Sequence, residues 1–335
     1  MNPVAASRIR RVREALPADA FKPNPRRLWM VAAHTAVVLA CYWWIRAWPA
    51  TALFAAVIIG HSLACLGFIA HEVSHNAVVR NRAVRYAVLL WTFGLNFVAP
   101  TMWNRLHNDA HHGNAGTPGD PDRPFLAHEK NRATVWYSTL FYPSESSWKT
   151  MLVFCHFISY LLRNMAAVFY PANRKPAVVS SKPSYQDRER WWTAAEIIWM
   201  LGLQYVVWLA AGSTWWGFLW ASLVPLCITS SIAMTYVFTQ HFLNPIEHET
   251  DPIAGTTSLV VPRWVDWLHC NFSFHTEHHV FPTMNSSYYP LVSRALQEEA
   301  GSEYRRIGAR AAWRQLWKTG MFRKVSESPL TSSEP

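Results

Sequence analysis

Two long stretches of this chain are almost free of charge. Arg46 is the only formally charged residue between Leu28 and Ile69, and no charge lies between Ile197 and Ile246. A membrane-spanning helix needs about 20 predominantly apolar residues, so each stretch has room for two spans. The pattern therefore predicts four transmembrane helices arranged as two hairpins. Their expected ranges are 28–48, 51–70, 192–211 and 216–240.

Composition supports a membrane protein. Of the 335 residues, 51% are hydrophobic, 16% are charged and 19 are tryptophan, whereas about a quarter of an average soluble chain is charged. Tryptophan pairs at 43–44, 191–192 and 215–216 lie near predicted span ends, where this side chain anchors helices at the membrane surface. The expected fold is an all-α integral membrane protein.

The net charge of +10 is distributed unevenly. The residues before the first span carry seven basic side chains, whereas the two hairpin tips carry only Arg46. The positive-inside rule therefore predicts a cytoplasmic N-terminus, and four spans then make the C-terminus and the segment between the hairpins cytoplasmic. Anionic membrane lipids account for the basic excess. No basic groove with interleaved aromatic residues indicates a nucleic-acid partner.

The membrane prediction divides the chain into three parts. These are a basic cytoplasmic tail (1–27), a membrane domain (28–325) with a cytoplasmic insert (71–190) and a cytoplasmic C-terminal region from 241, and a disordered tail (326–335). Within the insert, the apolar segments 84–104 and 148–170 either lie on the membrane surface or span it. We expect the insert and the C-terminal region to form a helical cap on the four spans.

Three histidine clusters fall in the parts assigned to this cap. They are HEVSH (His71, His75), HNDAHH (His107, His111, His112) and HTEHH (His275, His278, His279). Helical residues three or four apart share a face, so each cluster can converge on one point, with His112 directed to a second centre. Eight imidazoles beside lipid are costly without a ligand. They indicate two metal ions, and imidazole suits zinc, copper, iron or nickel.

The clusters and their surroundings resemble those of the membrane fatty acyl desaturases, in particular the acyl-lipid type. The resemblance runs from about His61 to Pro290 and includes HHGNAGTPGDPD and NFSFHTEHHVFPTMNSSYYPLV. It implies a non-haem site with two iron ions that uses O₂ to introduce a double bond into a fatty acyl chain. That chain would be carried by a lipid, coenzyme A or a carrier protein. A cofactor is needed for such chemistry because no protein base can deprotonate an unactivated methylene.

The resemblance also implies a ninth ligand at the end of the last span, and His241 occupies that position. Some relatives have an asparagine one turn earlier, where this chain has Val237. The acidic residues Glu72, Asp109 and Glu277 lie among the ligands. We expect them either to accept the distal N–H groups of ligand imidazoles or to solvate the rim of the site.

The acidic and histidine residues outside these sets are expected mainly to fold loops or to pack in the interior. Asp120 and Asp122 are expected to fold the loop after the second cluster. His61 either packs in the bundle or lines the substrate path. The other histidines have no partner at helical spacing and are expected to pack individually: His34, His128, His156, His248 and His269.

Electrons would come from outside the chain, because it has neither an HPGG-type haem-binding stretch nor a ferredoxin-like cysteine set. A ferredoxin or a cytochrome b5-type protein with its reductase is the expected donor. Three alternatives stay open. A hydroxylase or ketolase could share this scaffold. HEVSH also fits the zinc-protease pattern HExxH, with Glu72 as general base. A metal transporter or membrane scaffold would instead place polar residues along the spans.

Overall fold

The computed structural model describes residues 1–143, 148–170 and 185–326, with the backbone alone at 148–155. The tail predicted at 326–335 lies outside this range except for Ser326. The helices are α1 (Pro3–Glu14), α2 (Leu28–Ala47), α3 (Ala52–Ser74), α4 (Arg82–Leu95), α5 (Pro100–Trp103), α6 (His112–Asn114), α7 (Arg132–Phe141), α8 (Trp148–Phe169), α9 (Asp187–Ala210), α10 (Trp215–Phe218), α11 (Val224–His241), α12 (Arg263–Leu268), α13 (His275–Val280), α14 (Tyr289–Ala300) and α15 (Ala309–Trp317).

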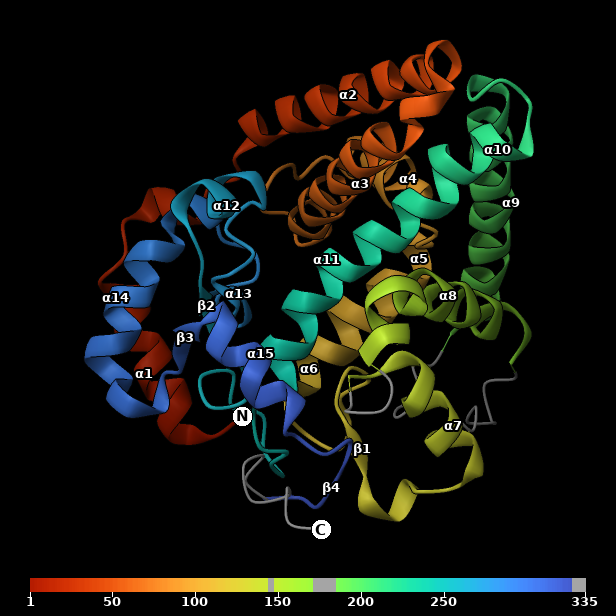
Figure 1. The fold of residues 1–335 in the computed structure, drawn as a ribbon. Helices are drawn as coiled ribbons and strands as arrows, with labels where there is room; N and C mark the ends of the chain where they lie inside the picture. The colour runs from red at the N-terminus through yellow and green to blue at the C-terminus, as the bar shows by residue number, and fades with distance from the viewer. Residues whose placement is uncertain (144–147, 171–184, 327–335) are drawn as a thin grey trace.

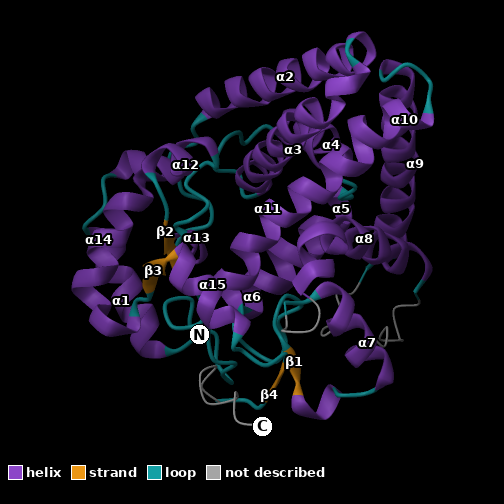
Figure 2. Ribbon diagram, in the orientation of Figure 1, coloured by secondary structure: helices purple, strands orange, loops and turns teal. Residues whose placement is uncertain are grey.

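Shorter elements join these helices. The π-helical segments are η4 (Asn104–His111) and η6 (Leu219–Leu223). The 3-10 turns are η1 (Ala18–Phe21), η2 (Pro25–Arg27), η3 (Pro49–Thr51), η5 (Ala127–Glu129), η7 (Ser286–Tyr288) and η8 (Gly301–Glu303). Two parallel strand pairs, β1 (Phe125–Leu126) with β4 (Phe322–Arg323) and β2 (Ser258–Val260) with β3 (Arg306–Gly308), tie the C-terminal region to earlier loops (Figure 2).

The four predicted spans are confirmed. Among the described residues, α2, α3, α9 and the continuous helix α10–η6–α11 are long and apolar enough to cross a membrane. Two bounds differ from the prediction. Helix α3 continues to Ser74 because the first histidine cluster is itself helical. Helix α9 begins at Asp187, where the Glu189 carboxylate accepts a hydrogen bond from the Gln186 amide and caps the first turn.

Helix α3 lies at the centre of the bundle, packed against α2, α4 and α11 (Figure 1). It is the most buried of the four spans, and α2 and α9 are the least buried. Gly60 allows the close approach of α3 and α11, since a Cβ at this position would lie 2.6 Å from the Cβ of Ile228. This contact aligns the C-terminal ends of α3 and α11, which both carry histidine.

The apolar segment 84–104 does not form a straight span. Helix α4 ends at Leu95, and the helical stretch from Pro100 to Asn114 is bent by 101° from it. Pro100 starts the second stretch, and Phe97 takes a positive φ of 57° in the break. The bend turns the second histidine cluster beneath α3. Helix α8, from the segment 148–170, packs against α7, α9 and α11.

A helical cap covers one end of the bundle and includes the N-terminal residues, which the sequence had set apart as a tail. Helix α1 packs on α14, with ion pairs of 2.5 Å from Arg8 to Glu303 and 2.6 Å from Arg11 to Glu299. Val12 is fully buried in an apolar core with residues of α13 and α14. The basic N-terminal residues therefore belong to the folded cap.

Candidate metal centre

Nine histidines from four parts of the fold meet where the cap joins the spans. Helix α3 and its C-cap contribute His71 and His75, the η4–α6 segment contributes His107, His111 and His112, α11 contributes His241, and α13 contributes His275, His278 and His279. Eight of the nine side chains are buried, and His112 is half-buried. All eight predicted ligands and the predicted ninth, His241, therefore lie together.

The nine imidazoles form two groups. The five-histidine group is His71, His75, His107, His112 and His278, and the four-histidine group is His111, His241, His275 and His279. Within each group, one ring nitrogen of every member lies within 4.8 Å of the others. The groups are adjacent, since the rings of His112 and His279 stack with centroids 4.4 Å apart. This arrangement suits two neighbouring ions.

The division differs from the helical-spacing prediction, which directed His107 and His111 to one point and His112 to another. Residues 104–111 are π-helical, with hydrogen bonds from residue i to residue i+5, so residues five apart lie on the same side. His107 and His112 therefore join the same group, with their Nε2 atoms 3.3 Å apart. His111 faces the other group.

The third cluster is also divided, although the prediction directed all three of its histidines to one point. His275 and His279 are four residues apart on one face of α13, and their Nε2 atoms lie 3.1 Å apart. His278 is on the neighbouring face and joins the five-histidine group, 3.1 Å from the Nε2 of His112. Helix α13 therefore contributes ligands to both groups.

Nitrogen spacings in the two groups fit metal binding. The Nε2 atoms are 2.9 Å apart for His71 and His107, and 2.7 Å apart for His241 and His275. An ion that binds imidazole at about 2.1 Å, with neighbouring ligands at right angles, separates the nitrogens by about 3.0 Å. The buried Nε2 of His75 has no hydrogen-bond partner among the residues that the structure describes. These nitrogens are arranged to share an ion.

Burial also keeps the candidate ligands uncharged. Desolvation lowers the pKa values of five histidines outside the spans: His107, His112, His275, His278 and His279. A neutral imidazole retains the lone pair that binds a metal. Crowding of several imidazoles in one buried place lowers these pKa values further.

Two side chains orient ligand rings from behind. The Nδ1–H of His111 donates a 2.7 Å hydrogen bond to Asp120, and both side chains are buried. Burial by itself lowers the pKa of His111, but the Asp120 carboxylate outweighs it and raises that pKa. On α13, Nδ1 of His278 lies 3.1 Å from the Tyr289 hydroxyl. In both rings Nε2 is left free to face the group.

Neither Asp120 nor Tyr289 is expected from the sequence to orient a histidine. Asp120 was assigned to the loop, and it does fold the loop by accepting hydrogen bonds from the backbone amides of Gly116 and Asp122. The same carboxylate also holds His111. The GDPD motif could have pointed to this contact, whereas no local pattern indicates Tyr289.

The three acidic residues predicted to hold imidazoles have other partners in the described part of the chain. The Glu72 carboxylate lies 3.8 Å from Arg27, and Asp109 is exposed and pairs with Arg105 at 2.7 Å. Glu277 accepts hydrogen bonds from Ser258, at 2.5 Å, and from Tyr304. These bonds attach α13 to β2 and to the chain after α14. Orientation of an imidazole by these carboxylates stays a prediction, and the exposed position of Asp109 agrees with the alternative that it solvates the rim.

Two histidines treated as separate in the sequence lie side by side below the metal centre. The Nε2 atoms of His61 and His269 are 3.3 Å apart, and Cys65 Sγ lies 3.8 Å from His61. The Tyr236 hydroxyl is 2.9 Å from Nδ1 of His269. Phe68 packs on His269, so this polar cluster borders the apolar surroundings of the first histidine cluster.

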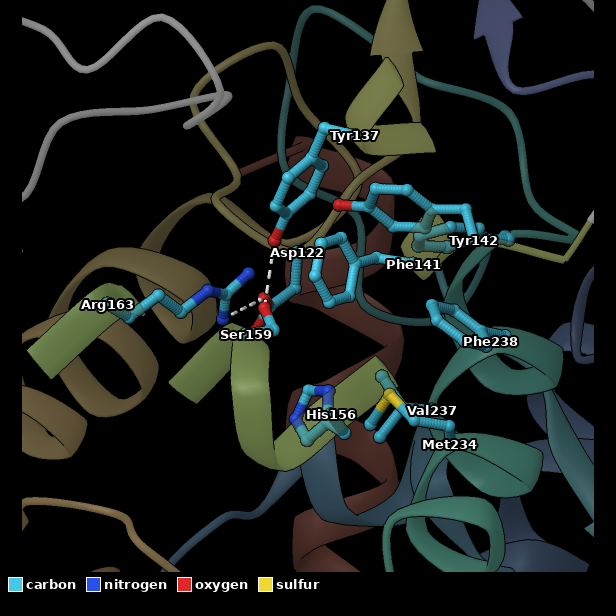
Figure 3. Close-up of a pocket in the computed structure, with 11 residues that line it drawn as sticks. Asp122, Tyr137, Phe141, Tyr142, His156, Ser159, Arg163, Met234, Val237 and Phe238 are labelled. Carbon is cyan, nitrogen blue, oxygen red and sulfur yellow. Dashed lines mark hydrogen bonds and ion pairs between the residues drawn. The ribbon is translucent and has the colours of Figure 1, made fainter. Parts of the chain in front are cut away.

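A small cavity of about 20 Å³, with room for about one water molecule, lies beside the centre (Figure 3). Val237 and His156 line it, and within the described ranges the buried Nε2 of His156 has no hydrogen-bond partner. Asp122, also in its wall, pairs with Arg163 at 2.9 Å. The Asp122 carboxylate belongs to a compact group with two of the centre's histidines, so it does more than fold the loop.

Comparison with known proteins decides the family. The family model described as fatty acid desaturase matches residues 42–311. The chain belongs to the fatty acid desaturase family. The chain is similar to the Delta(5) fatty acid desaturase fat-4 of Caenorhabditis elegans, with 26% identity over 263 residues, which cover 68% of the chain. The match covers 53% of that relative, about half its length. The predicted family is confirmed.

Proposed function

We propose that this desaturase uses O₂, two iron ions and an external electron donor to introduce a double bond into the acyl chain of a lipid or acyl thioester. One observation carries the proposal: five and four imidazoles, all but His112 buried, form two adjacent groups at the ends of apolar spans. Family membership supports desaturation of a fatty acyl chain.

The residues present fit two irons. The five-histidine and four-histidine groups would each hold one ion through imidazole nitrogen, a donor that suits iron. Bound there, iron would supply the O₂ chemistry that removes hydrogen from an unactivated methylene. The ring stacking of His112 on His279 keeps the two groups adjacent. Asp120 and Tyr289 would maintain the tautomers of His111 and His278 that direct Nε2 inward.

Apolar side chains prepare the site for a lipid tail. The Phe272 ring contacts both His71 and His275, with centroid distances of 5.1 and 5.5 Å, and therefore covers the two groups from one side. Phe68 packs on Phe272 with the ring centroids 4.6 Å apart and extends this apolar wall along α3. Such a wall excludes water and positions a methylene chain beside the imidazoles.

Geometry disfavours two of the alternatives. In a metalloprotease, Glu72 would face a metal-bound water, whereas here its nearest charged partner is Arg27. A protease site would need His71, His75 and one further ligand. Most of the nine imidazoles would then have no role. For a transporter, the donors would follow the spans, but the two histidine groups gather at one end. A hydroxylase or ketolase differs only in its product.

The partners and the orientation follow from the same proposal. Electrons would come from a ferredoxin or a cytochrome b5-type protein with its reductase. The basic N-terminal region favours a cytoplasmic location for both termini and for the histidine groups. A cysteine placed at Gly116 should therefore resist labelling from outside intact cells, and one at Gly212, in the α9–α10 tip, should react.

The decisive experiment expresses the full chain in a host that lacks the activity and localises double bonds in its acyl chains by mass spectrometry. A new double bond at one position, together with two irons per purified chain, is the expected result. A hydroxylated or oxidised acyl product would assign the chain to the alternative oxygenases. One zinc per chain, with no iron uptake under anaerobic loading, would refute the two-iron site.

A further inference from the structure

A second cavity, open and of about 760 Å³, lies on the side of the cap that faces the start of α2. Helix α12, α14 and strand β3 form its other walls, and Figure 1 shows α12 and α14 beside the beginning of α2. Its lining is polar and basic. The charged lining residues are Arg26, Arg27, Arg263, Arg294, Arg306 and Asp266.

The arginines in this cavity are poorly neutralised. Five arginines against one carboxylate give the lining a formal charge of +4. Within the described residues, no carboxylate pairs with Arg26, Arg263 or Arg294. Asp266 accepts a hydrogen bond from Ser273. Like charges held together without partners favour the binding of an anion.

One arginine is buried and incompletely bonded. Arg27 donates a 3.2 Å hydrogen bond to Ser286, and its guanidinium lies 3.8 Å from the Glu72 carboxylate. Its Nε is buried and has no hydrogen-bond partner in the described part of the chain. A guanidinium presents paired N–H groups that match the oxygens of a phosphate. The chemistry of the lining therefore selects a phosphate group.

Tryptophan places the cavity at the level of lipid headgroups. Arg26 and Arg27 immediately precede α2, and Trp29 lies in its first turn. The rings of Trp29 and Trp267 pack with centroids 5.9 Å apart, and both are more than half exposed. Exposed tryptophan beside arginine at a span end is typical of the membrane–water interface. A ligand here can keep its tails in the bilayer.

The cavity shares residues with the surroundings of the metal centre. Arg27 faces Glu72, the neighbour of His71 in the chain. Phe274, in the cavity wall, precedes His275. The cavity thus contacts residues next to both α3 and α13. With His75 at the C-cap of α3, these two helices contribute five of the nine clustered histidines.

We propose that this cavity binds the phosphate of a glycerophospholipid, which is the carrier of the acyl substrate. The phosphate binds to Arg263 and Arg294 at the open side and to Arg27 at the buried side. Trp29 and Trp267 border the glycerol region. The assignment as substrate carrier rests on the proposed desaturase function, whereas phosphate binding itself does not.

Binding to the purified full chain in detergent tests the site without iron or an electron donor. The probes are dioctanoyl phosphatidylglycerol, phosphate-free dioctanoyl galactosylglycerol, octanoyl coenzyme A and inorganic phosphate, each titrated by thermophoresis. We expect phosphatidylglycerol to bind and the galactolipid to bind at least about tenfold more weakly. The double variant Arg263→Gln/Arg294→Gln should weaken phosphatidylglycerol binding roughly thirtyfold, because each arginine near an anionic lipid contributes about fivefold.

The matched control is Arg310→Gln/Arg314→Gln, which removes two exposed arginines of α15 outside the cavity. It should bind phosphatidylglycerol like the wild type, and Arg263→Lys/Arg294→Lys should recover part of the lost affinity. Equal losses in the Gln pocket variant and in the control would overturn the proposal. The proposal would also be overturned if the galactolipid bound as tightly as phosphatidylglycerol, or if octanoyl coenzyme A bound more tightly and depended on the two arginines. A dependence on the two arginines for inorganic phosphate alone would overturn it as well.

A separate assay distinguishes this site from the proposed function. If lipid binding depends on the two arginines but no unsaturated product forms with any donor, the desaturase proposal fails and the phosphate site stands. If product forms while binding is independent of them, the site fails. A pocket variant that binds lipid normally and instead loses salt-dependent reduction by the donor identifies a protein-docking patch, which also overturns the proposal.

Discussion

Replacement of Asp120 by asparagine tests how the protein holds its metal ligands. Asp120 accepts the Nδ1–H of His111 at 2.7 Å and the backbone amide of Gly116 at 3.1 Å, one on each carboxylate oxygen. Asparagine has only one acceptor oxygen, so its NH₂ would face one of these donors. Either the neutral amide oxygen replaces the charged acceptor of the His111 Nδ1–H, or the NH₂ group removes that contact. In both cases His111 is directed less firmly toward the four-histidine group.

The magnitude follows from burial and charge. Both side chains of the His111–Asp120 pair are almost completely buried. A hydrogen bond to a charged group contributes about 1.5–3 kcal/mol, which corresponds to roughly 10- to 150-fold in affinity. Loss of a group that orients a metal-binding histidine typically costs 10- to 100-fold in affinity or activity. We therefore expect Asp120→Asn to lower iron affinity at one of the two centres by about this factor.

The assay is chelator competition on the purified chain, with iron counted per protein, beside the thermal unfolding temperature of the iron-free form. Asp109→Asn is the matched control on the same segment, because Asp109 is exposed and pairs only with Arg105. An exposed pair contributes about 1 kcal/mol or less, so iron affinity should change little. Equal effects of the two variants, or unchanged affinity in Asp120→Asn, would refute the reasoning. If Asp120→Asn lowered the unfolding temperature of the iron-free protein as much as that of the iron-loaded protein, the role of Asp120 would be purely structural.

Four further outcomes are expected. Alanine at any of the eight clustered histidines or at His241 should abolish product formation at a normal protein level, whereas His248→Ala should retain it. Product formation by two or more of the cluster variants would disprove the assignment of these histidines as iron ligands. Chelation should remove activity, and iron, unlike zinc, should restore it. Gly60→Val should destabilise the bundle by about 1–3 kcal/mol in detergent unfolding, because its side chain would collide with Ile228; unchanged stability would contradict the close helix contact. Burial raises the pKa of Asp122, but Arg163 outweighs it and lowers that pKa to about 2, so this pair should add roughly 2 kcal/mol of stability above about pH 4. That stability should be lost as the pH falls toward 2. If the free energies of unfolding of the wild type and Asp122→Asn differed by a constant amount across this pH range, the prediction would be contradicted.

Much of the architecture follows from local sequence properties. Span formation depends on long apolar stretches. The stretch 28–69, with Arg46 as its one charge, and the charge-free stretch 197–246 therefore predicted α2, α3, α9 and α11. Histidine spacing likewise identified eight histidines that lie together, and the family resemblance added His241. These predictions succeed because hydrophobicity and helical periodicity are carried by neighbours in the chain.

Tertiary structure decided the contacts between distant segments. The π-helical geometry of residues 104–111 paired His107 with His112, which spacing on an α-helix would not do. Side-chain direction made Asp120, and not Asp109, the partner of His111.

The same limit applies to contacts that join separate helices. His61 and His269 are 208 residues apart, and only the packing of α3 against the loop after α12 brings them together. The arginine cavity unites residues from the start of α2 with α12 and α14. Local sequence determines which segments become helices, but hydrogen-bond and ion partners depend on side-chain directions that only the packed fold defines.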